Sequence, residues 1–171
     1  YDGNAGEYGK GGITGMKESI HTYFQIGTIQ WMSHPKREVL QSIRDIAADD
    51  YFDAIEVRHF EDDRIREEAR RILEQRHLKG CYGAQPTLLS RKLNPNDTDE
   101  DGRKRAEQAL IAAVDEAEYL GAKGIAFLAG KWTEETKEEA FGQLVKTTVN
   151  VCNYAARKNM VVNLEVFDYN M

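Results

Sequence analysis

The chain has 171 residues, of which 41% are hydrophobic and 30% charged, a composition that suits one domain with its own core and excludes disordered, collagen-like and coiled-coil proteins. Its formal net charge of −6 disfavours a nucleic-acid partner held by broad contact with phosphates. No apolar run approaches the roughly 20 residues that a membrane-spanning helix needs, so we expect a cytoplasmic protein without a membrane partner.

The first segment, residues 1–15, contains six glycines and no periodic apolar residues. Ordering such a segment costs more backbone entropy than usual, so we expect a flexible leader with few packed contacts. The run Gly9–Gly15 lacks the Gly-Lys-Ser/Thr ending and the preceding strand of a phosphate loop, which disfavours a nucleotide site there. Residues 16–171 are predicted to form one domain.

Strand and helix patterns alternate from Phe24 onward. Ser33 before Pro35 predicts a helix start after the first strand, and Gly121 predicts the end of the third helix. The connection 87–101 is longer than most, which favours a functional loop or one with short turns of its own. The predicted strands are Phe24–Met32, Phe52–Phe60, Lys79–Gln85, Gly124–Ala129 and Met160–Phe167.

The alternation of strands and helices predicts parallel strands joined by right-handed crossovers. No glycine-rich turn follows the first strand, which disfavours an open nucleotide-binding sheet. Polar residues gather instead at strand C-terminal ends, the active face of a (β/α)8 barrel. We therefore predict an α/β fold of the TIM-barrel type, incomplete with about five of eight βα units, its strands in sequence order and its helices on the outer face only.

Four segments resemble the sugar phosphate isomerase/epimerase family, which has the xylose isomerase-like barrel. They are Ile26–Trp31, Ile55–His59, Leu120–Ile125 and Val162–Asp168. The resemblance implies a divalent metal at the barrel mouth, manganese first, with magnesium, cobalt or zinc as alternatives. It also implies that Glu165 is the first metal ligand and the carboxylate that transfers a proton. The family's other three ligands would follow Met171.

Glu165 lies within an apolar strand, where an unpaired buried carboxylate is costly, so we expect its side chain to face a polar mouth shared with Gln30 and Glu56. Glu56 and His59 are three residues apart and face opposite sides of a continuing strand. Both are candidate substrate contacts, with a solvated loop edge as the alternative.

Gln30 and four further residues are also candidate substrate contacts. Trp31 would form an apolar wall against a sugar ring, although core packing is an equal alternative. Gln85 would donate to a hydroxyl. Lys131 would bind a carboxylate, phosphate or hydroxyl, or is an ordinary surface lysine. Asp168 would bind a hydroxyl, orient a neighbour or cap a loop.

The predicted function is metal-dependent sugar (phosphate) isomerisation or epimerisation by proton abstraction next to a carbonyl, with a small carbohydrate as substrate. One alternative is a lyase of the same barrel family that cleaves an oxidised C-glycoside by β-elimination. The other is an inactive half-barrel that serves as an interaction module. Open strand edges predict a homo-oligomer or association with the missing barrel half.

Overall fold

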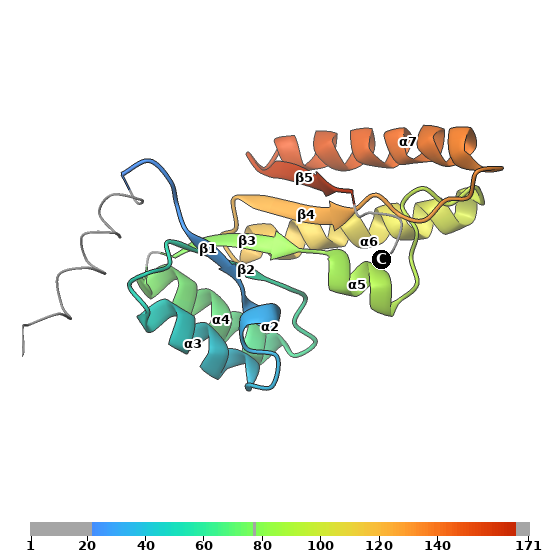
Figure 1. Cartoon of the computed structure of the whole chain (residues 1–171). Coiled ribbons are helices and arrows are strands. Elements are labelled where there is room, and N and C mark those ends of the chain that lie inside the picture. The colour runs from blue at the N-terminus through green and yellow to red at the C-terminus, as the bar shows by residue number, and fades with distance from the viewer. Residues whose placement is uncertain (1–21, 77, 167–171) are drawn as a thin grey trace, which may run out of the picture.

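The computed structural model describes residues 22–76 and 78–166 (Figure 1). The predicted leader 1–15 and the candidate Asp168 lie outside these ranges. The strands are β1 (Gly27–Ile29), β2 (Ala54–Val57), β3 (Lys79–Gly83), β4 (Gly124–Leu128) and β5 (Val161–Glu165). The helices are α2 (Gln30–Ser33), α3 (Val39–Ala48), α4 (Asp63–Arg76), α5 (Gln85–Ser90), α6 (Glu100–Tyr119) and α7 (Lys137–Ala156).

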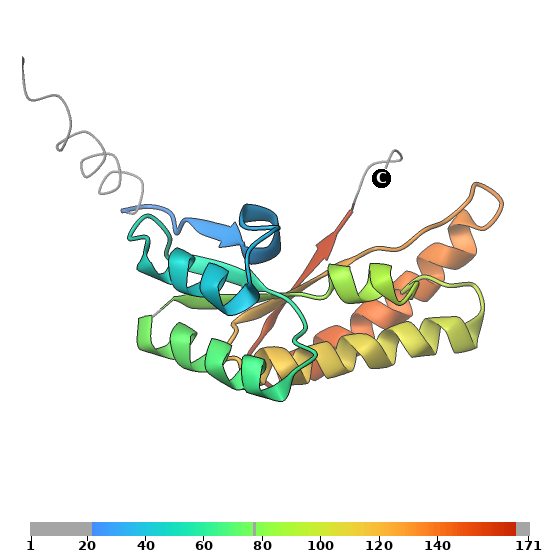
Figure 2. The same cartoon turned by 90° about the horizontal axis from the view of Figure 1, so that it is seen from below.

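The five strands form one parallel sheet in the order β1-β2-β3-β4-β5, as the sequence predicted. Each strand is followed by a helix before the next strand pairs beside it, which is the repeating unit of a TIM-type barrel. Figures 1 and 2 show the strands side by side, with β1 and β5 at the two edges.

The apolar core lies between the sheet and the four long helices α3, α4, α6 and α7, which occupy one side of the sheet (Figure 2). The register pairs Val57 with Tyr82 and Tyr82 with Ile125, so these buried side chains share the face that meets the helices. We call the opposite face of the sheet the inner face. The prediction that the long helices cover only one face is confirmed.

The first strand is shorter than predicted, because the chain turns into α2 at Gln30 instead of continuing to Met32. The Ser33 hydroxyl donates to the Ile29 carbonyl at 2.9 Å and closes this helical turn. The next helix does not start at Ser33 and Pro35 as predicted. It starts at Val39, because the Glu38 carboxylate accepts hydrogen bonds from the first free backbone N–H groups.

Two other local predictions are confirmed. Gly121 has a φ of +73° directly after the end of α6, a conformation that glycine adopts without a Cβ clash. The long connection before α6 contains the short helix α5.

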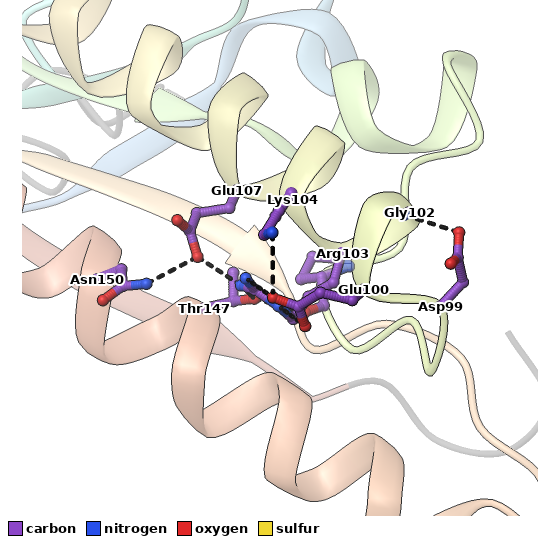
Figure 3. A network of polar contacts seen from close by, with 9 residues as sticks. Asp99, Glu100, Gly102, Arg103, Lys104, Glu107, Thr147 and Asn150 are labelled. Carbon is purple, nitrogen blue, oxygen red and sulfur yellow. Dashed lines mark hydrogen bonds and ion pairs between the residues drawn. The ribbon is translucent and has the colours of Figure 1, made fainter.

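The pair α6 and α7 is joined by a buried cation (Figure 3). Arg103 is 4% exposed, and its guanidinium donates to the Glu100 and Glu107 carboxylates and to the Thr147 hydroxyl on α7. Thr147 in turn donates to the Pro95 carbonyl in the loop before α6 at 2.8 Å. A buried charge is tolerated here because every side of the guanidinium has a partner.

Within the described ranges, none of the helices has the length and apolar character needed to cross a membrane.

Candidate functional site

Two acidic side chains, Glu56 of β2 and Glu165 of β5, lie on the inner face of the sheet. The register places Glu56 opposite Cys81, Gly83 opposite Ala126, and Glu165 opposite Leu128. Because side chains alternate along a strand, Glu56, Gly83 and Glu165 all belong to the inner face. Glu56 and Glu165 both lie near the C-terminal ends of their strands, the edge at which the sequence placed the active site.

Gln85, the first residue of α5, connects these two carboxylates. Its amide nitrogen donates to Glu165 Oε2 at 2.9 Å and lies 3.5 Å from Glu56 Oε1. The residue is 9% exposed, and its Oε1 is buried without a hydrogen-bond partner among the described residues. The sequence predicted Gln85 as a hydrogen-bond donor. In the structure, the amide nitrogen of Gln85 points to the two carboxylates, and its amide oxygen has no hydrogen-bond partner among the described residues.

Gly83 provides the close approach that brings these groups together. A Cβ at this position would lie 2.4 Å from the Trp31 ring, 2.6 Å from Gln85 Oε1 and 2.6 Å from Glu56 Oε1. Trp31, from α2, therefore lies against the backbone of β3 beside the two polar side chains. Gly83 was not among the residues predicted from the sequence, although a glycine inside a strand is a recognised signal of close approach.

The two carboxylates at this edge repel each other. Burial raises the pKa of Glu56 above its ordinary value, the nearby Glu165 carboxylate raises it further, and the hydrogen bond from Gln85 partly offsets both effects. Two negative groups at one partly buried edge therefore favour either a shared proton or a bound cation.

A hollow of about 480 Å³ opens on the inner face beside Glu56. Its walls come from β1, the start of α2, β2 and Cys81 of β3. Small residues such as Gly27 and Ala54 leave this space open. Glu56 is the acidic group of the lining, so it connects the hollow with Gln85 and Glu165.

His59 lies beyond the end of β2 at Val57, so strand alternation does not set its side, and its side chain contacts the helix layer. Its Nδ1 is 2.7 Å from the Glu116 carboxylate on α6, which also accepts from the Tyr82 hydroxyl at 2.8 Å and the Phe60 N–H at 3.2 Å. This arrangement secures the loop after β2 to the helix layer. His59 therefore belongs to a hydrogen-bond network around Glu116 and does not contact Glu56, Gln85 or Glu165.

Gln30 and Lys131 are also outside this cluster. The Gln30 residue is 3% exposed and its amide donates to the Ser42 hydroxyl on α3 at 2.7 Å, so it does not share the side of Glu165 as expected. Lys131 has an exposed side chain, and its backbone N–H and carbonyl are both held by the Asn94 side chain. Asn94 was not selected from the sequence, although its Asn-Pro-Asn turn was visible.

The side-chain oxygens at this edge are of the type that binds a hard divalent cation. Glu165 and Glu56 offer carboxylate oxygens, and Gln85 offers an unpartnered amide oxygen, the ligand types that magnesium and manganese prefer. Over residues 22–76 and 78–166, no group of three or more His, Cys, Asp or Glu side chains is arranged to hold an ion. A complete coordination sphere therefore needs donors in addition to these.

Comparison with known proteins gives one family. The family model described as xylose isomerase-like TIM barrel matches residues 19–170. No curated protein matches the sequence at a significant level.

Solved structures share the fold at low sequence identity. A D-tagatose 3-epimerase-like protein has a TM-score of 0.69 and 16% identity, covering 82% of this chain and 52% of its own. D-psicose 3-epimerase from Clostridium cellulolyticum H10, solved with D-tagatose, has a TM-score of 0.69 and 18% identity, covering 85% and 53%. A xylose isomerase-like barrel protein from Mycobacterium smegmatis, solved with magnesium, has a TM-score of 0.50 and 14% identity, covering 75% and 46%. The chain spans about half the length of these structures.

Proposed function

Because the chain belongs to the xylose isomerase-like TIM barrel family, we propose that the whole protein is a sugar isomerase or epimerase that removes a proton next to a carbonyl. The observation that carries this proposal is the convergence of Glu56, Gln85 and Glu165 at the edge where such barrels place their active sites. The solved neighbours named as ketose epimerases support a small carbohydrate, free or phosphorylated, as substrate.

Glu165 is the proposed proton-transfer group. Its carboxylate accepts the proton from the carbon next to the carbonyl, and the C–H electron pair forms the double bond of an enediolate as the carbonyl oxygen takes the negative charge. A second acid on the opposite face of the sugar delivers a proton to the same carbon to give the epimer, while Glu165 keeps the proton that it removed. Transfer of the proton from Glu165 to the neighbouring carbon gives the isomer. The hydrogen bond from Gln85 holds the carboxylate in one orientation for this transfer.

Glu165 is also the proposed first ligand of a divalent metal, with manganese or magnesium favoured by its oxygen donors. When bound, such an ion supplies positive charge that stabilises the enediolate oxygen. Glu56 Oε1 lies 3.5 Å from the amide nitrogen of Gln85, so its carboxylate is a second proposed oxygen donor to the same metal site.

The remaining groups are proposed to hold the sugar. The Trp31 ring offers an apolar wall beside Gly83, and the Gln85 amide, which donates to Glu165, keeps that carboxylate oriented beside the sugar. Lys131 and Asp168 stay as predicted contacts to the substrate's polar groups.

The test is Glu165→Gln in the whole protein. This change keeps the side-chain shape and removes the charge, so manganese affinity measured by calorimetry should fall at least about 10-fold. Turnover should fall by about 10²–10⁴-fold, because the amide cannot accept the proton. Incorporation of deuterium from D2O next to the carbonyl, measured by NMR on ketose and aldose substrates, reports the proton-transfer step directly.

Glu74→Gln is the matched control, because Glu74 is exposed on α4 and has no ion pair among the described residues. It should leave manganese affinity and deuterium incorporation unchanged. If Glu165→Gln behaves like Glu74→Gln, the assignment of Glu165 is wrong.

A further inference from the structure

A second hollow, of about 230 Å³, lies between the loop after β2 and helix α5. We call it the rim hollow. It is separate from the Glu165 cluster, because Gln85 at the start of α5 faces that cluster while later residues of α5 face the rim hollow. The residues that matter for its chemistry are Arg58, His59, Glu61, Thr87, Ser90 and Arg91.

Two uncompensated positive charges line the rim hollow. Arg58 and Arg91 are exposed, and neither forms an ion pair with a carboxylate within the parts of the chain that the structure describes. Some other arginines of this acidic chain are paired with carboxylates, as in Arg44 with Glu68 and Arg103 with Glu100. Two guanidinium groups beside one hollow repel each other, and an anion between them relieves that repulsion.

Neutral hydrogen-bond donors stand beside these charges. The Thr87 hydroxyl makes no hydrogen bond within the described ranges, and the Ser90 hydroxyl donates only weakly, to the Thr87 carbonyl at 3.3 Å. His59 is not one of these donors, because it donates its Nδ1–H to Glu116 and the Nε2 of the neutral ring is then an acceptor. Planar guanidinium groups and hydroxyls together match the tetrahedral oxygens of a phosphate.

The carboxylates near the rim hollow do not cancel its charge. Glu116 has a side chain that is 9% exposed and is already engaged by His59, Tyr82 and the Phe60 N–H. Glu61 lines the hollow 4.0 Å from His59 Nε2, but its side chain is 90% exposed and therefore strongly screened by water. Glu61 should weaken anion binding without preventing it.

We propose that the rim hollow is a binding site for a phosphate-type oxyanion, held by Arg58 and Arg91 with help from Thr87 and Ser90. The proposal does not depend on the reaction assigned to Glu165. The oxyanion can be free phosphate or the phosphoryl group of a sugar phosphate, and the two sources are separable by experiment.

The test is titration of the chain with inorganic phosphate, followed by ¹H–¹⁵N NMR, with chloride at equal ionic strength as the blank. Saturable shifts at Arg58, Thr87, Ser90 and Arg91 are expected, with a Kd on the order of 1 mM. Arg58→Gln and Arg91→Gln should each weaken binding about 10-fold, the loss of one charged hydrogen-bonding partner. Glu61→Gln should strengthen it.

Arg105→Gln is the matched control, because Arg105 is exposed, without an ion pair in the described ranges, and outside the rim hollow. It should leave phosphate binding unchanged, and circular dichroism should show all four variants folded. Equal losses in Arg58→Gln, Arg91→Gln and Arg105→Gln would mean non-specific charge attraction and overturn the proposal, as would the absence of saturable shifts. A sugar phosphate that binds more tightly than inorganic phosphate identifies the phosphorylated sugar as the source, and equal affinity identifies the free ion.

Discussion

Gly83 determines how closely the groups of the candidate site approach one another. Its missing side chain lets Trp31, Glu56 and Gln85 meet above the backbone of β3. The two polar side chains that meet there are the ones that contact or face Glu165. A glycine, which has no functional side chain, thus sets the geometry of the residues proposed to carry out the reaction.

Gly83→Ala adds a single methyl group, yet it should displace the side chains of the candidate site. The new Cβ would lie within 2.6 Å of the ends of three side chains, so these ends must move. Because side-chain ends can reorient, the free energy of unfolding should fall by only about 1 kcal/mol. Thermal or urea unfolding measures this loss. In the whole protein, displacement of Gln85 should also lower manganese affinity.

Gly142→Ala is the control for this substitution. Gly142 lies inside α7 and is exposed, and a Cβ added there would have no neighbouring atom within 4 Å among the described residues. Alanine there should stabilise the chain by about 0.5–1 kcal/mol, because it lowers the entropy lost on folding. Equal effects of the two substitutions would contradict the role assigned to Gly83.

The pair α6 and α7 shows how a polar network can join two elements. Arg103 contacts its own helix through Glu100 and Glu107 and reaches α7 through Thr147 (Figure 3). Hydrogen bonds from Arg103 lower the pKa of Glu100 to about 2, with the charges of Arg103, Lys146 and Lys104 adding to the shift. The folded chain therefore prefers the ionised form of Glu100.

This preference predicts a pH dependence of stability. A carboxylate whose pKa is lower in the folded state stabilises the fold above its unfolded pKa of 4.5, and that contribution is lost as pH falls toward 2. Glu100→Gln should therefore reduce the loss of stability between about pH 5 and pH 2. Urea unfolding at several pH values measures it, and Glu74→Gln should keep the original slope. An unchanged slope in Glu100→Gln would refute the coupling to Arg103.

The whole sheet leaves apolar surface open at its β5 side. On α7, Phe141 is 64% exposed, Val145 44% and Val149 50%, and their spacing of four residues places them on one face of the helix. In β5, Val161 is 62% exposed and the strand has no neighbour beyond it in the described sheet. In a closed barrel, further βα units cover such a helix face and such a strand edge.

The chain by itself should therefore associate through this surface. Size-exclusion chromatography with light scattering should show a mass that rises with protein concentration. Phe141→Ser should shift the equilibrium toward monomer, because it removes the largest exposed apolar side chain of the stripe. Lys146→Ser, a polar exposed position on the same helix, should not. A monomer at every concentration would contradict the prediction that the exposed apolar face of α7 mediates association.

The sequence by itself determined the fold class. Alternation of strand and helix patterns is a local property, and parallel strands with right-handed crossovers follow from it, so the sheet order could be derived without coordinates. It did not determine where His59 lies, because β2 ends at Val57 and the alternation of a strand does not extend to His59.

Only the tertiary structure decided which polar side chains meet. Gln30, Gln85 and Lys131 all follow strands, yet only Gln85 contacts Glu165, because helix α3 offers Gln30 a buried hydroxyl and the loop at Asn94 holds the backbone of Lys131. These partners are distant in sequence, and a single strand pattern carries no information about them. A side chain's role depends on which neighbour satisfies its hydrogen bonds, and that neighbour is chosen by packing.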